Sequence, residues 1–272
     1  MKRLSLFNIT SLTLGFAFLY LPMVLLVIYS FNASKLVTVW AGFSTKWYGE
    51  LLRDEAFLDA AWVTIKVAVI SSSLATILGT LAAYVLVNAG RFFGRTLFSG
   101  MIYAPLVMPE VITGLSLLLL FIGIGLDRGV LTIVLAHTTF SMCYVSVVVS
   151  SRLVSFDKSL EEAALDLGCT RFEAFRLVTL PIIAPAVISG WLLAFTLSLD
   201  DLVIASFVSG PSSTTLPIKI WSAVRLGVSP EINALSTLMI GVVTVGVIAA
   251  SLVSKRKTLR AQKDEQAAER SD

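Results

Sequence analysis

A polar island lies between the fourth and fifth apolar segments of the chain, and its central part, from Ser159 to Pro181, reads SLEEAALDLGCTRFEAFRLVTLP. The whole island covers residues 155–181. Ser159 and Thr170 are each followed three residues later by Glu, a capping-box pattern that starts a helix. Gly168 stands where a left-handed residue commonly ends one. These signals predict two short helices, followed by an apolar segment that has Pro181 in its first turn.

The composition is that of a membrane protein. Of the 272 residues, 56% are apolar and only 14% are charged, whereas about a quarter of a soluble domain is charged. The mean hydropathy is +0.87. A net charge of +3 does not call for a nucleic-acid partner. The two cysteines, Cys143 and Cys169, belong to different levels of a membrane protein, so we expect neither a disulfide nor a metal cluster from them.

Six apolar segments are each near the ~20 residues that a helix needs to cross a bilayer. The first is too long for the apolar core of a signal peptide, and no cleavage site follows it, so we expect a retained anchor. The segments lack the alternation of barrel strands, which predicts an all-α membrane protein with a six-span domain over residues 1–254 and a charged tail over 255–272. The six segments are Thr10–Phe31, Trp62–Val87, Met101–Ile124, Gly129–Ser150, Ile182–Val208 and Ala234–Ser254.

Lys and Arg are divided unequally between the two sides of these segments. The side with both termini and the polar island holds fourteen of them, and the other side holds six. Because loops rich in Lys and Arg stay in the cytoplasm, we predict that both termini and the island are cytoplasmic.

Ionisable residues inside the apolar segments are candidates for a functional site. Glu110 falls near the middle of the third segment, next to Pro105 and Pro109, which would kink or open a helix there. Asp200 and Asp201 fall toward the outer end of the fifth. Carboxylates at two depths favour a path for a cation, and Glu110, Asp200 and Asp201 are the predicted path residues. Glu110 could instead be protonated and hydrogen-bonded within a broken helix.

The two adjacent aspartates point about 100° apart around a helix. One could therefore line the path while the other caps a helix or pairs. His137, in the fourth segment, is more often a structural residue in such a setting. Gly190, Ala194 and Ser198 recur every four residues, which predicts close helix packing against a partner subunit or a narrow lumen wall.

The island also has the properties of a docking surface. Ala163, Ala164 and Gly168 leave room for another backbone, and Phe172 and Phe175 are costly on a cytoplasmic loop unless a partner covers them. Glu162 is either a cap or a polar contact to that partner. Several aromatic residues of the first outer loop (Trp40, Phe43, Trp47 and Tyr48, with Lys46) form either a second docking surface or an interfacial belt.

Written as E-A-A-x3-G-x9-[I/V]-x-L-P, the island resembles the loop by which membrane subunits of binding-protein-dependent ABC importers dock into their ATPase. Val178 takes the place of the usual Ile. Further stretches resemble the permeases of polyamine (spermidine/putrescine) importers, in particular the second permease of the putrescine system. They are Phe31–Tyr48, Pro109–Ile112, His137–Phe140, Ser189–Pro211 and Val228–Leu235.

This resemblance implies six transmembrane helices in the type I, methionine-importer-like fold, with residues 155–181 as the coupling loop. It implies a bacterial inner-membrane protein that takes putrescine from a periplasmic binding protein by alternating access. A second homologous permease and a cytoplasmic ATPase dimer would complete the importer. The chain has no P-loop, so ATP and Mg²⁺ would bind the ATPase, and the permease itself would have no catalytic residue, metal or cofactor.

Other classes fit less well. An intramembrane hydrolase would need a nucleophile matched to His137 or two opposed aspartates, and the sequence pattern offers neither. A scaffold with a docking loop remains possible. A permease of the same fold for another cationic solute is the nearest alternative, and the residues do not choose between putrescine and spermidine.

Overall fold

The computed structural model describes residues 5–36, 39–227, 230–241 and 244. Their regular secondary structure is helical, apart from one isolated bridge between Asn32 and Phe43, as the sequence predicts. Residues 230–241 form a helical stretch after a gap. In chain order the other helices are α1 (Leu6–Tyr29), α2 (Lys46–Leu51), α3 (Glu55–Asn88), α4 (Arg95–Val107), α5 (Glu110–Gly123), α6 (Val130–Val154), α7 (Ser159–Asp166), α8 (Arg171–Ala174), the π-turn η1 (Phe175–Thr179), α9 (Leu180–Asp200), α10 (Val203–Val208) and α11 (Leu216–Leu226).

Within these described residues, four helices are long and apolar enough to cross a membrane. They are α1, α3, α6 and the continuous helix Arg171–Asp200, and a fifth span results if the bent pair α4 and α5 crosses as one. The sixth predicted segment, Ala234–Ser254, lies mostly outside the described residues, and the predicted tail, 255–272, lies entirely outside them.

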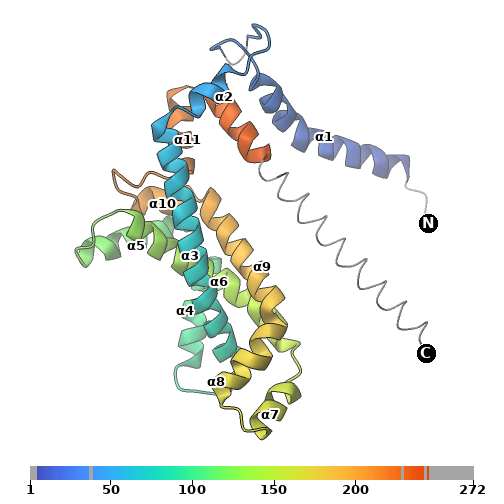
Figure 1. Ribbon diagram of the computed structural model, residues 1–272, viewed down its shortest axis with the longest axis vertical. Helices are drawn as coiled ribbons and strands as arrows, with labels where there is room; N and C mark the ends of the chain where they lie inside the picture. The colour runs from blue at the N-terminus through green and yellow to red at the C-terminus, as the bar shows by residue number, and fades with distance from the viewer. Residues whose placement is uncertain (1–4, 37–38, 228–229, 242–243, 245–272) are drawn as a thin grey trace. The chain divides into compact units, whose positions relative to one another are not determined.

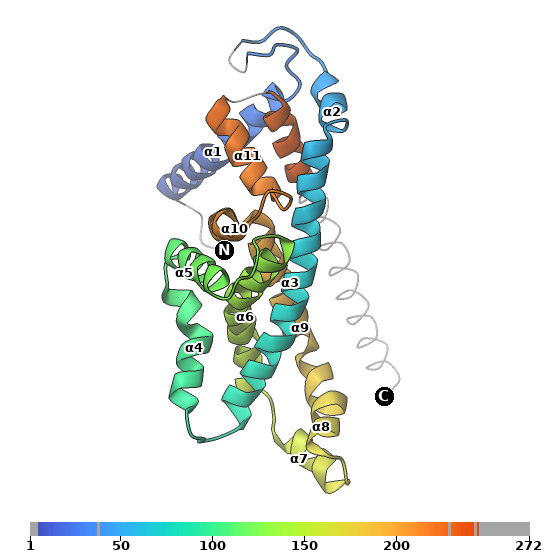
Figure 2. The same cartoon turned by 90° about the vertical axis from the view of Figure 1, so that its left-hand side faces the viewer.

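The chain divides into two compact units, residues 56–221 and residues 1–55 with 222–272. In the first unit α3, α6 and α9 run side by side, with α7 and α8 at one end (Figures 1 and 2). Small buried side chains on α3, such as Ala75 and Ala83, pack in one cluster with Val145 and Val149 and let α6 come close. A Cβ on Gly79 would lie 2.8 Å from both the Met142 carbonyl oxygen and Val145 Cβ, so this crossing requires glycine.

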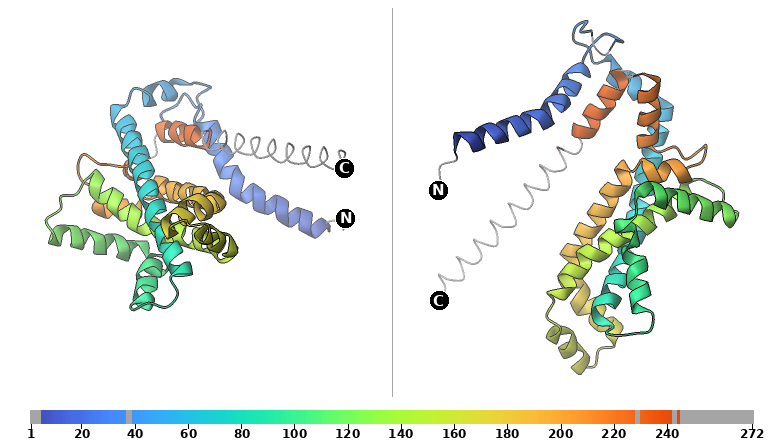
Figure 3. Two further views of the ribbon diagram at one scale, coloured as in Figure 1. Left: turned by 60° about the horizontal axis from the view of Figure 1, so that its bottom comes forward. Right: turned by 180° about the vertical axis from the view of Figure 1, so that it is seen from behind.

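The third predicted segment is not one helix. It is broken between Val107 and Glu110, and α4 and α5 meet at a bend of 119°, which is visible in Figures 2 and 3. Pro109 is the N-cap residue of α5, and Met108 before it is extended. The predicted opening of the helix at its prolines is confirmed, because a proline removes a backbone donor and disfavours helical backbone at the residue before it.

The fifth predicted segment, Ile182–Val208, has different limits in the structure. It divides after Asp200, with Asp201 and Leu202 between α9 and α10. At its other end the helix does not begin near Pro181 but is continuous from Arg171. The π-turn η1 ends at Thr179, two positions before Pro181, and the wider turn accommodates a ring that would otherwise meet the carbonyl four residues back. The second predicted short helix is thus the first turn of a long one.

The other unit includes α1 and an ordered loop. Asn32 is buried in that loop; its Oδ1 accepts the N–H of Ser34 at 3.2 Å and of Ala41 at 2.9 Å, and its Nδ2 donates to the Val39 carbonyl at 2.7 Å. Trp47 Nε1 donates to the Asn32 carbonyl at 2.6 Å. A single side chain therefore fixes the path of the loop.

Candidate functional site

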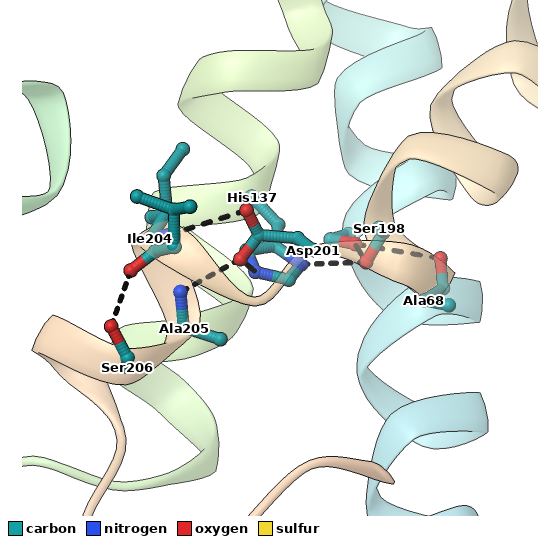
Figure 4. Close-up of polar contacts among 9 residues, drawn as sticks. Ala68, His137, Ser198, Asp201, Ile204, Ala205 and Ser206 are labelled. Carbon is teal, nitrogen blue, oxygen red and sulfur yellow. Dashed lines mark hydrogen bonds and ion pairs between the residues drawn. The ribbon is translucent and has the colours of Figure 1, made fainter. Parts of the chain in front are cut away.

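A buried polar cluster lies where α9 breaks (Figure 4). His137 of α6 is 2% exposed, and its two ring nitrogens lie 2.6 Å from Ser198 Oγ and 3.1 Å from Asp201 Oδ2. Ser71 of α3 donates to Ser198 Oγ at 3.1 Å. The cluster therefore joins α3, α6 and the end of α9 through side-chain hydrogen bonds, in a setting where an unpaired polar group is costly.

Asp201 has a second set of partners. Its carboxylate accepts the backbone N–H of Ile204 at 3.3 Å and of Ala205 at 2.7 Å, which makes it an N-terminal cap of α10. The sequence allowed one of the two aspartates to cap or pair, and the structure assigns that role to Asp201. Its neighbour Asp200 is the last residue of α9 and is exposed.

Ser198, His137 and Asp201 have the composition of a hydrolase triad, which the sequence pattern did not reveal. The cluster differs from a catalytic site in access. Ser198 is 4% exposed and already accepts a hydrogen bond from Ser71. None of the three residues lines the groove beside α7 or the smaller hollow beside Asp59. A nucleophile needs room for a reacting carbon beside it, so the cluster is structural.

Glu110 lies at the other broken helix. It is the first residue of α5, directly after Pro109, and it is exposed. The unpaired N–H groups at a helix N-terminus favour a negative charge there. Glu110 and Asp200 are thus the two predicted path carboxylates with accessible side chains, each beside a break in a helix.

The polar island forms α7, α8 and η1. Thr170 and Glu173 make the predicted capping box: the Thr170 N–H donates to Glu173 Oε2 at 2.8 Å, and the Glu173 N–H donates to Thr170 Oγ1 at 3.3 Å. The Thr170 backbone N–H, with the Thr170 hydroxyl, lowers the pKa of Glu173. Gly168 has the predicted left-handed backbone, with φ +92°.

The capping box predicted at Ser159 is wrong. The N-cap residue of α7 is Lys158, and it makes no side-chain cap bond. Asp157 Oδ1 instead accepts the Ser159 N–H at 3.0 Å. The acidic residue before the serine competes for the same backbone donors, so the serine is drawn into the helix. Hydrogen bonds from Ser159 lower the pKa of Asp157.

Most of the predicted docking residues lie on the surface of the island. Glu162, Ala163 and Gly168 are exposed, and Phe172 is 71% exposed, whereas Ala164 is 7% exposed. Phe175 differs from the prediction, because it is half-buried with its ring 4.8 Å from that of Tyr84. One phenyl ring is therefore available to a partner and the other packs within the chain.

A groove of about 570 Å³ runs between these helices and the end of α3. Glu162 and Phe172 line it from the island, together with Lys158 and Arg171. The remaining lining residues are Leu81, Tyr84, Val85, Asn88, Ala89, Glu161, Leu165 and Phe175. An apolar floor with charges of both signs at its rim is typical of a protein docking surface.

Glu161 is a site residue that the sequence analysis missed. Its Oε1 accepts from the Tyr84 hydroxyl at 2.6 Å and its Oε2 from Thr179 Oγ1 at 2.9 Å. Two adjacent glutamates in a capping pattern look alike in sequence. Only the packing of α3 against the island distinguishes them.

The small-residue face of α9 packs within the chain and not against a partner subunit. Gly190, Ala194 and Ser198 are all buried. A Cβ on Gly190 would lie 3.2 Å from Val145 Cγ1 of α6, and Ser198 bonds the cluster around His137. The intersubunit interface predicted for this face is therefore wrong; the period of four residues does serve close helix packing, as the sequence suggested.

The loop after α1 is partly exposed and partly buried. Trp47 is 3% exposed, and the Tyr48 hydroxyl lies 2.6 Å from Ser30 Oγ, so both serve the loop's own structure. Lys46 Nζ lies 4.2 Å from the centre of the Trp47 ring. Trp40 and Phe43 remain exposed for a partner or a membrane interface.

A second, smaller hollow of about 210 Å³ is lined by Asp59, Lys219 and neighbouring residues of α3 and the 211–214 turn.

No group of three or more His, Cys, Asp or Glu side chains that could hold a metal ion occurs among the described residues.

Comparison with known proteins shows which family this chain resembles. Residues 75–257 match the family described as the inner membrane component of binding-protein-dependent transport systems. The chain is 61% identical over 260 residues to the putrescine transport system permease protein PotI of Escherichia coli (strain K12), covering 93% of this chain and 92% of that protein. It is 43% identical over 247 residues to the spermidine/putrescine transport system permease protein PotC of the same strain, covering 91% and 93%.

Two solved structures share the fold. A bacterial ABC transporter that imports the acidic polysaccharide alginate has a chain with a TM-score of 0.70 at 18% identity, covering 94% of this chain and 99% of that one. The inward-facing methionine transporter MetNI has one with a TM-score of 0.59 at 16% identity, covering 77% and 95%. The helical arrangement is therefore that of ABC importer permeases.

Proposed function

The chain belongs to the family of inner membrane components of binding-protein-dependent transport systems, and on that premise we propose that it is the permease through which an ATP-driven importer moves putrescine across the inner membrane. As a member of that family it is a multi-pass permease and not itself an ATPase. A binding protein and an ATPase are its partners.

The observation that carries the choice of solute is the 61% identity to a putrescine permease along 93% of the chain. The site supports it through charge. Asp200 and Glu110 are exposed carboxylates at helix breaks, and a diammonium solute carries two positive charges that such groups attract. Weak binding at each suits a path, because a tight site would hold the solute back.

In the proposed importer the permease has six spans over residues 1–254, both termini in the cytoplasm, and a charged tail over 255–272. A second, homologous permease completes the path, and a periplasmic protein delivers putrescine to it. The ATPase dimer, which holds ATP and Mg²⁺, docks on the coupling surface formed by Glu162, Ala163, Ala164, Gly168, Phe172 and, from beneath, Phe175. ATP binding draws the two docking loops together and opens the path outward, and hydrolysis reverses this change.

The test is uptake of labelled putrescine by the complete complex in proteoliposomes. Asp200→Asn and Glu110→Gln should each lower uptake at limiting putrescine roughly tenfold, corresponding to a loss of ~1.4 kcal/mol of attraction. ATP hydrolysis and assembly should be unchanged. Asp127→Asn is the matched control, because Asp127 is an exposed carboxylate in the loop between α5 and α6.

Uptake that both variants leave at the control level would refute the path assignment. Uptake of another cation but not of putrescine by the unaltered complex would refute the choice of solute and favour a permease of the same fold for that cation. Competition by unlabelled spermidine reports which polyamine is preferred.

A further inference from the structure

We propose that Glu161 is the positioning residue that transmits movement of the docked ATPase to the membrane spans. Its carboxylate links α7 by hydrogen bonds to α3 and to the π-turn η1, which leads into α9. This inference deepens the proposed function and rests on it. Glu162, its neighbour, is exposed and lies on the surface offered to the partner. Glu162 would therefore contact the ATPase, and Glu161 would link α7 to the rest of the chain.

The fastening consists of one carboxylate and two donors on different elements. The Tyr84 hydroxyl, near the end of α3, donates to Glu161 Oε1 at 2.6 Å. The Thr179 hydroxyl, the last residue of η1, donates to Glu161 Oε2 at 2.9 Å. Both acceptor oxygens are thus engaged, and hydrogen bonds to a charged acceptor are shorter and stronger than neutral ones.

The surroundings of the fastening add stiffness. Thr179 is fully buried, at 0% exposure, and Glu161 is half-buried. The Tyr84 ring contacts the edge of Phe175 in the same π-turn, with 4.8 Å between ring centres. Tyr84 therefore joins α3 to the island twice, once by its hydroxyl and once by its ring.

The consequence is mechanical. When the ATPase displaces α7, that helix cannot move alone, because the Glu161 carboxylate is hydrogen-bonded to α3 and to η1 at the start of α9. Coupling of this kind passes through packed side chains and hydrogen bonds that have a defined arrangement. In the absence of the carboxylate, the docking surface of α7 would remain, but its movement would no longer be passed to the two spans.

The experiment compares Glu161→Ala, Glu161→Gln and Asp166→Ala in the complete reconstituted complex. Asp166 is the matched control, since it is an exposed carboxylate at the end of the same helix. Glu161→Ala should keep the ATPase bound but lower the putrescine transported per ATP hydrolysed roughly tenfold. Glu161→Gln keeps an acceptor for Tyr84 and should recover most of that ratio. Tyr84→Phe, which removes one hydroxyl only, should lower it to an intermediate value.

A second readout needs no solute. Nucleotide binding to the unaltered complex should change the labelling rate of a cysteine placed at Leu78, an exposed residue of α3, in a background with Cys169→Ser. Glu161→Ala should abolish the change. If nucleotide alters labelling but putrescine is not taken up, the proposed solute is wrong and the role of Glu161 is supported.

Two results would overturn the inference. One is a Glu161→Ala complex that transports as much per ATP as Asp166→Ala and keeps the nucleotide-dependent labelling. The other is loss of ATPase binding in Glu161→Ala together with an unchanged ratio in Tyr84→Phe, which would make Glu161 part of the docking surface instead.

Discussion

Asp200 and Asp201 are neighbours in the chain with opposite surroundings. Asp201 accepts from two backbone N–H groups of α10 and lies against His137, with a side chain 8% exposed. Asp200 ends α9 and is exposed. The break in the helix separates the two side chains. The Asp201 carboxylate caps α10 and is therefore turned away from the surface, whereas Asp200, before the break, stays exposed. The backbone is extended at Asp201, with φ −65° and ψ 122°, which is where the helix breaks.

Replacing His137 should destabilise the protein more than any path substitution. His137→Ala removes one of the hydrogen-bond partners of the buried Asp201 carboxylate and of the buried Ser198 hydroxyl, at a cost of about 2 kcal/mol. The melting temperature of the purified permease in detergent measures this. Thr139→Ala, at an exposed position two residues along α6, is the control and should differ little from the unaltered protein. Equal stability of the two variants would refute the structural role of the cluster.

Residue roles were predictable from sequence where a backbone signal accompanied the side chain. Thr170 with Glu173 forms its capping box, and Gly168 has its left-handed backbone. The roles of His137 and Glu161 were not, since His137 depends on Ser198 and Asp201, 61 and 64 positions away, and Glu161 depends on Tyr84, 77 positions away. Such pairings arise from the packing of helices and leave no local pattern.

At the scale of elements, close packing of α3 on α6 depends on glycine and other small residues. Gly79→Ala would place a Cβ 2.8 Å from a backbone oxygen of α6, which the helices can relieve only by moving apart. We expect a loss of about 1–3 kcal/mol, as for other overpacked cores. Gly100→Ala in α4, where a Cβ meets nothing within 4 Å, is the control and should be neutral or slightly stabilising. Thermal unfolding in detergent compares them.

The cap of α8 should weaken in acid. The Thr170 N–H holds the pKa of Glu173 below its ordinary value of 4.5, so the cap stabilises the helix above that value and is lost as the pH falls through the lowered one. Amide hydrogen exchange over residues 170–176 should therefore accelerate, relative to the intrinsic rate, only below about pH 4.5. Glu173→Gln should remove this dependence.

The matched control for that experiment is Asp157→Asn. Asp157 also has a lowered pKa, but at the start of α7, so its loss should leave the pH dependence of residues 170–176 unchanged. An acid response of the α8 segment that persists in Glu173→Gln would mean that another group is responsible.

The breaks in the elements were foreseeable to different degrees. Pro105 and Pro109, just before Glu110, marked the break between α4 and α5, although nothing in the sequence set its angle of 119°. The break after Asp200 had no proline or glycine to mark it, and the apolar run continued to Val208. Tertiary contacts of Asp201 decide that break, so periodicity alone could not locate it.

For the whole molecule, apolar segment lengths and composition were enough to predict an all-α membrane protein, and the island motif was enough to predict the importer family. The packing of α9 within its own chain was not predictable, because a small-residue face serves equally well inside a subunit and between subunits.

Sidedness is the prediction at this scale. An impermeant thiol reagent added to spheroplasts should label a cysteine at Leu52, and should label one at Leu167 only after the membrane is permeabilised, since loops rich in Lys and Arg stay inside. Both side chains are exposed, at 64% and 88%, so access within the protein does not limit the reaction. Labelling of Leu167→Cys in intact spheroplasts would contradict the cytoplasmic position of the island.

The π-turn of η1 has a consequence for how this permease can change over generations. A π-turn has one residue more than the α-helical turn it replaces, and it lies within a continuous helix of 30 residues, Arg171–Asp200. Deletion of a single codon between Phe175 and Thr179 would leave an α-helical turn in place of the π-turn, and α8 would keep nearly the same rotation relative to α9, because the wide turn takes up its extra residue within one turn. A one-residue deletion elsewhere in an α-helix would instead rotate the two flanking parts by about 100° relative to each other. The π-turn is therefore a place where the chain can lose one residue while the orientation of α8 relative to Asp200 is inherited intact.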